Sequence, residues 1–136
     1  MNTSALAGKW VLVSWTNKSN NKIYYPFGKH PEGWLKLTNN EFVALTQKDT
    51  SSIEKGEQLN TPFYNDNVLE FSSSGTYKLK DDEIILEYKE SSVAELNHTQ
   101  RTRKYNFDGH RTLIIWGDKT IGNEICSVSG TYLKVD

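Results

Sequence analysis

Two arginines stand close together in the stretch HTQRTRKYNF, residues 98–107. Side chains alternate between the two faces of a β-strand, so Arg101 and Arg103 would share a face with Tyr105 and Phe107. The apolar rings of Tyr105 and Phe107 are expected to face a hydrophobic core, and the alternation then turns both arginines inward. A guanidinium inside a protein needs a carboxylate or a bound anion, because burying an unpaired charge costs several kcal/mol.

A guanidinium is a planar fork of five N–H donors, which suits a carboxylate or an enolate-like oxygen. We therefore expect Arg103, nearer the apolar end of the strand, to bind the polar head of a ligand whose body lies on aromatic walls. The alternative is structural: Arg101 lies in water at the mouth of the fold, and Arg103 pairs with an internal acid such as Glu87. The ligand-binding residues predicted from the sequence are Arg103, Arg101, Tyr105, Tyr25, Trp34, Tyr88, Tyr77 and Glu87.

Aromatic side chains are the candidates for the walls of such a site. Tyr24 and Tyr25 lie on opposite faces of their predicted strand, so one of them points inward. Trp34 is expected either at the rim of a cavity or at a half-exposed edge. Tyr77 and Tyr88 belong to the side chains expected to point inward. A pocket is mostly apolar with a few placed polar groups, and these residues fit that description, although a solid core would use the same apolar side chains.

The elements that must position these residues are short strands. Aromatic and β-branched residues recur in runs separated by Asn, Asp, Gly and Ser, which is typical of an all-β chain with many turns. The predicted strands cover residues 9–16, 22–26, 33–38, 41–46, 67–72, 75–80, 83–89, 99–107, 111–116 and 124–135. The polar segment 47–66 interrupts this rhythm and is expected to be either a lid or a solvated connector.

About ten strands joined mostly by hairpins predict an antiparallel sheet that closes, or nearly closes, into a barrel. Closure removes exposed strand edges, and with this number of strands it leaves a lumen that can hold a small ligand. A two-sheet sandwich has the same periodicity and is the competing architecture. The length of 136 residues predicts a single domain over residues 1–136.

Composition argues against several functional classes. The chain has 16 Lys plus Arg against 17 Asp plus Glu, whereas a nucleic-acid-binding protein usually shows a basic excess. No stretch approaches the ~20 apolar residues that cross a bilayer. The N-terminus does not resemble a secretory signal. We therefore expect no nucleic-acid partner and no membrane span, and a soluble cytoplasmic protein.

The sequence also lacks the common motifs of metal, cofactor and nucleophile sites. The histidines His30, His98 and His110 are dispersed without metal-ligand spacing, and Cys126 is the single cysteine. The sequence contains no recognisable phosphate-binding glycine-rich loop and no recognisable Ser-His-Asp arrangement. We therefore expect neither a metal nor a cofactor.

Several motifs together carry a family resemblance. These are Gly8 and Trp10, then Leu12, Val13 and Ser14, then Tyr25, Pro26 and Gly28, and then Gly33 and Leu35. The later stretches GTYKLKDDEI, QRTRKYNFDGHRTLII and SGTYLKV have a similar order and spacing. The chain resembles the lipocalin-like domain family, small single-domain β-barrels of calycin type, over nearly its whole length except 47–66.

The resemblance implies an antiparallel up-and-down β-barrel of about 8–10 strands that holds a small ligand, with Trp10 as a packing plug at its closed end. Relatives often have a pair of histidines on the strand that corresponds to 83–89, where this chain has Leu86 and Glu87. Chemistry that depends on those histidines is therefore not implied here. A shared fold does not by itself transfer an activity.

We predict that the chain binds a small, largely apolar molecule with an anionic or carbonyl group in the barrel lumen, as a carrier, sensor or binding module. Its partner would be a hydrophobic or amphipathic small molecule. The alternative is a cofactor-free isomerase or cyclase acting on a polyketide-like or terpenoid-like metabolite, with Arg103 polarising a carbonyl and a tyrosine or Glu87 moving a proton. A third possibility is a protein-interaction barrel with a solid core.

Overall fold

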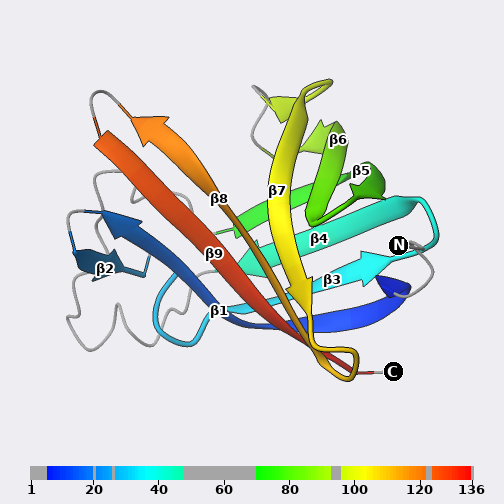
Figure 1. The fold of residues 1–136 in the computed structure, drawn as a ribbon, viewed down its shortest axis with the longest axis horizontal. Helices are drawn as coiled ribbons and strands as arrows, with labels where there is room; N and C mark the ends of the chain where they lie inside the picture. Colours follow the sequence, from blue (N-terminus) through cyan, green and yellow to red (C-terminus); the bar gives the residue numbers. More distant parts are fainter. Residues whose placement is uncertain are drawn as a thin grey trace.

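The computed structural model describes residues 6–19, 21–25, 27–47, 70–92, 96–121 and 124–135. Nine β-strands follow one another in this part of the chain, each antiparallel to its neighbours (Figure 1). They are β1 (Gly8–Ser19), β2 (Lys22–Tyr24), β3 (Glu32–Leu37), β4 (Glu41–Gln47), β5 (Glu70–Lys80), β6 (Glu83–Ser91), β7 (Gln100–Phe107), β8 (Thr112–Ile121) and β9 (Glu124–Lys134).

Eight of these strands close into a barrel. The hydrogen-bonded order is β1-β3-β4-β5-β6-β7-β8-β9, and β9 pairs back with β1. The short strand β2 lies outside this ring and pairs with the end of β1, from Asn17 to Ser19. The antiparallel up-and-down barrel predicted from the sequence is therefore confirmed, and the sandwich is excluded.

Several of the predicted strand boundaries are wrong. The sequence predicts separate strands over 67–72 and 75–80, but β5 continues without a turn from Glu70 to Lys80. Its register with β6 is instead irregular between Ser74 and Gly75. Strand β8 is also longer than predicted, because β9 pairs with it as far as Ile121. Residues 48–66 lie outside the described part of the chain, so the lid stays a prediction.

A β-bulge in β1 changes which residues face the inside of the barrel. Leu12 lies opposite Tyr132 of β9, whereas Ser14 lies opposite the preceding residue of β9. Val13 is therefore the extra residue, and the alternation shifts by one position. Before the bulge the inward positions have even numbers, and after it Trp15 and Asn17 face inward.

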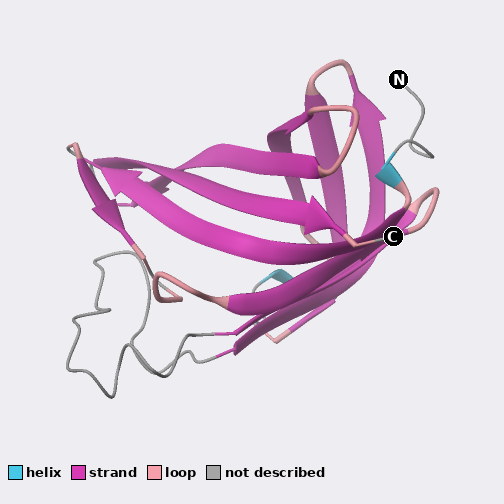
Figure 2. Ribbon diagram, turned by 90° about the horizontal axis from the view of Figure 1, so that it is seen from below, coloured by secondary structure: helices cyan, strands magenta, loops and turns pink. Residues whose placement is uncertain are grey.

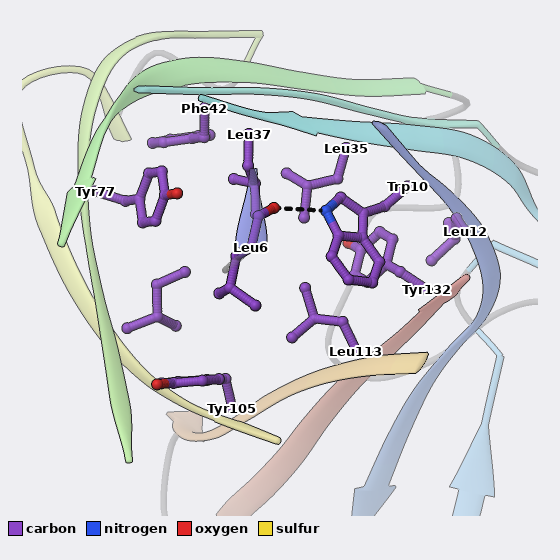
Figure 3. Close-up of a cluster of buried hydrophobic side chains, with 11 residues drawn as sticks. Leu6, Trp10, Leu12, Leu35, Leu37, Phe42, Tyr77, Tyr105, Leu113 and Tyr132 are labelled. Carbon is purple, nitrogen blue, oxygen red and sulfur yellow. Dashed lines mark hydrogen bonds between the residues drawn. The ribbon is translucent and has the colours of Figure 1, made fainter. Parts of the chain in front are cut away.

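The hydrophobic core occupies one end of the barrel (Figure 3), the end at which β7 and β8 are paired. Trp10 is 0% exposed at its centre. The indole Nε1 of Trp10 donates a hydrogen bond to the carbonyl oxygen of Leu6 at 3.0 Å. The ring of Phe107 meets the Trp10 ring edge to face, with centroids 5.5 Å apart. We call this the closed end, and Trp10 plugs it as the family resemblance implies.

Away from the closed end, β7 and β8 separate. The two strands pair only from Lys104 to Phe107, opposite residues 113–116. Strand β8 continues beside β9 for five further residues, up to Ile121. Figure 1 shows β7 turning away from the β8–β9 hairpin, and Figure 2 shows the strands of the barrel from below. We call this the open end. Arg103 is the first residue of β7 beyond the part that pairs with β8.

Candidate ligand-binding site

Strand β7 turns its arginines toward the inside of the barrel. Tyr105 is buried and Arg101 and Arg103 are half-buried, whereas the residues between them are exposed. On the outer face, the Nζ atom of Lys104 lies 3.5 Å from Oδ2 of Asp82. The predicted alternation along this strand is therefore confirmed.

A tyrosine of the neighbouring strand lies close to both guanidiniums. Tyr88 of β6 shares the inner face with Leu86, which lies opposite Arg101. Burial raises the pKa of the Tyr88 hydroxyl, and the positive charges of Arg101 and Arg103 oppose that rise because they favour the phenolate. The net direction is upward, so the Tyr88 hydroxyl keeps its proton at neutral pH and acts as a hydrogen-bond donor.

A second phenol comes from β9. Tyr132 is buried on the inner face, and its pKa is raised first by burial and second by the nearby Tyr88 hydroxyl. The Tyr88 ring also meets Phe42 edge to face, with centroids 5.5 Å apart. The inner face around Tyr88 thus combines aromatic surface with two protonated hydroxyls and two guanidiniums.

The position of the Arg103 side chain depends on a glycine in β8. A Cβ atom at Gly117 would lie 2.5 Å from Cδ and 3.1 Å from Nη1 of Arg103. The distance of 2.5 Å is too short for a real contact, so the Arg103 side chain can lie over β8 in this position because residue 117 has no side chain. The Nη1 atom also lies 3.5 Å from the carbonyl oxygen of Thr102. Arg103 therefore extends along the barrel wall.

Two predicted ligand-binding tyrosines belong to the packed closed end. The Tyr77 hydroxyl donates to the carbonyl oxygen of Thr38 at 2.5 Å, and burial raises its pKa to about 12. The Tyr105 hydroxyl lies 3.5 Å from the carbonyl oxygen of Asp81. Both rings are part of the buried core. They stabilise the barrel beside the arginines, and a direct ligand contact for either one stays a prediction.

Two other predicted site residues lie on the outer face. Glu87 is exposed, and its Oε2 accepts a hydrogen bond from Thr76 at 3.5 Å. The same alternation that turns Leu86 and Tyr88 inward turns Glu87 outward, so the expected internal pairing with Arg103 is wrong. Trp34 lies opposite Leu45 of β4 on the outer face, since its neighbour Leu35 is buried inside. Trp34 therefore does not line the lumen.

Tyr25 follows β2 in the connection that leads to β3. Its side chain is half-buried, and the Nζ atom of Lys29 lies 6.0 Å from its ring centroid. This cation–π contact is local to the connection. A role for Tyr25 in ligand binding stays a prediction.

Two inward residues of β1 beyond the bulge, Trp15 and Asn17, were not predicted from the sequence. Trp15 lies over Gly130 of β9, where a Cβ atom would be 3.1 Å from the indole Cε3. Asn17 is 0% exposed. No described residue hydrogen-bonds to Nε1 of Trp15 or to Nδ2 and Oδ1 of Asn17. Each such buried polar group costs about 1–3 kcal/mol.

The sequence did contain a signal for this arrangement. An unbroken alternation from Trp10 through Leu12 would bring Lys18 inside the barrel. A lysine is rarely buried without a partner. A bulge before Trp15 avoids that burial, leaves Lys18 exposed as observed, and turns Asn17 inward instead.

The described residues contain neither a metal-binding cluster nor a membrane-spanning helix. No group of three or more His, Cys, Asp or Glu side chains among them is placed to hold a metal ion. Within the same residues, no helix has the length and apolar character required to cross a bilayer.

The chain is similar to known proteins along most of its length. The model of the lipocalin-like domain family matches residues 7–130. A crystal structure of an uncharacterized protein from Bacteroides eggerthii is similar, with a TM-score of 0.45, 18% sequence identity, and coverage of 94% of this chain and 98% of that chain. No curated protein matches this chain. The family match runs from β1 into β9 and includes the arginines, Gly117 and Asn17.

Proposed function

The chain belongs to the lipocalin-like domain family, and we propose that it binds in its barrel a small, largely apolar molecule that carries a carboxylate or a carbonyl group. The observation that carries this proposal is the convergence of Arg101, Arg103 and Tyr88 on the inner face at the open end. The lipocalin-like barrel supports ligand binding in general. The side chains on its inner face support the chemical class.

Each polar group in this cluster can donate a hydrogen bond. A guanidinium has five N–H donors and no acceptor, and a protonated phenol donates one hydrogen bond and can also accept. Arg101 forms no ion pair with any residue that the structure describes. Donors of this kind complement an oxygen acceptor, most strongly a carboxylate. The aromatic and aliphatic surface around Tyr88 would pack against the apolar body of the ligand.

The same groups favour binding over proton transfer. A general base must lose its proton near the working pH, but burial raises the pKa of both Tyr88 and Tyr132. Glu87, the other candidate base, lies on the outer face. A role as carrier or sensor therefore fits these residues better than a role as isomerase or cyclase.

The test is calorimetric titration of the protein with decanoate and with decan-1-ol, which share a chain and differ in the head group. We expect the wild type to bind decanoate more tightly and Arg103→Leu to lose about tenfold or more in decanoate affinity. The matched control is Lys104→Leu, since Lys104 is adjacent and faces outward. This control should bind decanoate like the wild type.

Unchanged decanoate affinity in Arg103→Leu would overturn the proposal. If that variant fails to fold by circular dichroism, Arg103 has a structural role, and Arg101→Leu then tests the site by the same titration. Equal affinities for decanoate and decan-1-ol in the wild type would also count against a site for an acceptor head group.

A further inference from the structure

We propose that Asn17 and Trp15 form a second polar subsite of the barrel, which hydrogen-bonds a carboxamide-like group at the far end of the ligand. The inference rests on the proposed function in one respect, that a ligand occupies the barrel. It adds a separate recognition element on β1, two strands away from the guanidinium of Arg103.

The first argument is the unused hydrogen-bonding capacity of these side chains. Asn17 is fully buried, and no described residue bonds to its Nδ2 or Oδ1. The indole Nε1 of Trp15, on the same face, also has no described partner. Their surroundings include the buried apolar side chains of Cys126 and Val128. Buried polar groups in folded proteins are almost always partnered, so an exception requires an explanation.

The second argument is the type of partner that these groups accept. The Asn17 amide offers two N–H donors and one carbonyl acceptor, and the Trp15 indole offers one donor. A complementary group must therefore supply a donor beside its acceptors. A primary carboxamide or a lactam does so, whereas a carboxylate has no proton for Oδ1 of Asn17. The ligand group that suits Asn17 must therefore both donate and accept hydrogen bonds, whereas the ligand group that suits Arg103 needs only to accept them.

The third argument is the position of the subsite relative to the arginines. Asn17 of β1 lies opposite Val128 of β9, which lies opposite Gly117 of β8. Arg103 lies over Gly117. The distance from the guanidinium to Asn17 along the wall is therefore two strand spacings, about 10 Å. Val128 is the residue between them in this row, so a ligand with a polar group at each end of an alkyl chain of this length would reach both subsites.

Entry to this subsite requires a movement of the chain around it, because Asn17 is closed off from solvent. Phe27, in the connection between β2 and β3, is 3% exposed. Its ring meets Trp15 edge to face, with centroids 5.9 Å apart. Displacement of Phe27 would open the face of Trp15 to a ligand.

The experiment compares three probes of equal chain length: decanoate, decanamide and the monoamide of decanedioic acid. We expect the wild type to bind the monoamide about tenfold more tightly than decanoate. In Asn17→Leu the two affinities should become equal, while decanoate affinity is retained. Trp15→Phe, which removes the indole N–H together with one of the two fused rings, should reduce the preference for the monoamide.

Thermal unfolding of the ligand-free protein gives an independent readout. Asn17→Leu should keep or raise the Tm, because it removes an unpartnered amide. The matched control is Tyr77→Phe, which removes a buried hydroxyl that does have a partner, the carbonyl oxygen of Thr38. This control should lower the Tm. A fall in Tm for Asn17→Leu would show that the amide is structural and would overturn the subsite.

The outcomes separate this inference from the proposed function. Arg103-dependent binding of decanoate without a preference for the monoamide would overturn the subsite alone. Decanamide binding that depends on Asn17 and is unchanged in Arg103→Leu, without decanoate binding, would overturn the arginine site of the proposed function and leave the subsite standing. If Asn17→Leu does not fold, the ratio of monoamide to decanoate affinity is measured in Trp15→Phe instead. A ratio equal to that of the wild type would overturn the subsite. The absence of binding for all three probes would overturn both.

Discussion

Trp10 and Trp15 lie on the same strand and face the inside of the same barrel, Trp10 at the centre of the closed end and Trp15 further along β1, where it packs between the two buried clusters. Trp10 is fully buried, and its indole N–H donates to the Leu6 carbonyl. Trp15 is half-buried, and its indole N–H has no partner among the described residues. The closed end thus satisfies its central indole internally, whereas Trp15 and Asn17 keep hydrogen-bonding groups without a partner among the described residues.

Strand β7 shows the same division. Tyr105 packs into the core where β7 is paired with β8, and the arginines follow where the two strands have separated. Stabilisation and recognition are therefore placed at different ends of one barrel. This separation matters because a site with unpartnered polar groups is destabilising, and a well-packed region elsewhere in the fold can offset its cost.

The largest expected difference between the two ends comes from the tryptophans themselves. Trp10→Ala should lower the free energy of unfolding by about 3–5 kcal/mol, because it leaves a cavity in a fully packed cluster. Trp15→Ala should cost at least ~1 kcal/mol less, since Trp15 is half-buried and loses no hydrogen bond. Urea denaturation measures both values. Equal losses would show that the open end is packed as a core.

A smaller effect is expected at Tyr77 of the closed end. Tyr77→Phe should lower the free energy of unfolding by about 1 kcal/mol at neutral pH, because it removes the hydrogen bond to Thr38. Burial raises the Tyr77 pKa from 10.0 to about 12, so the folded state holds this proton more tightly than the unfolded chain. The stabilisation is complete below pH 10 and is lost as the pH rises from 10 to 12.

The variant lacks this titrating group. Its free energy of unfolding should therefore fall less steeply than that of the wild type across the same alkaline range. Denaturant titrations at several pH values measure the two slopes. Parallel slopes would contradict the assignment of Tyr77 to the buried closed end.

The smallest effect on stability is expected at the open end, at Gly117. Gly117→Ala should change the free energy of unfolding by less than about 1 kcal/mol, because the flexible Arg103 side chain can move away from the new methyl group. Decanoate affinity should nevertheless fall several-fold, since the guanidinium leaves its place over β8. Calorimetric titration measures this loss, and wild-type affinity would show that the location of Arg103 over Gly117 is not required.

Gly109→Ala is the matched control for that substitution. Gly109 has a φ of +84° in a turn, and no neighbouring heavy atom lies within 4 Å of the position that a Cβ would take. Alanine there is strained by the backbone conformation alone and should destabilise the fold. Decanoate affinity should stay at the wild-type value, which is the reverse of the pattern expected at Gly117.

Much of this arrangement could be predicted from local patterns, and the errors have specific causes. The alternation in 99–107 correctly placed Arg101 and Arg103 inside, and the same rule applied to 83–89 would have placed Glu87 outside. The rule failed for β1, because the bulge at Val13 shifts the alternation by one residue. It also said nothing about Gly117, whose importance depends on an arginine from another strand.

The sequence by itself determined the all-β fold and the inward direction of the arginines, because the two-residue period of a strand is a local property that burial of Tyr105 makes unambiguous. Only the tertiary structure decided that Arg103 lies over Gly117 and that the amide of Asn17 is buried without a described partner. Those contacts depend on strand register and on a bulge, which arise from pairing between segments that are distant in the chain.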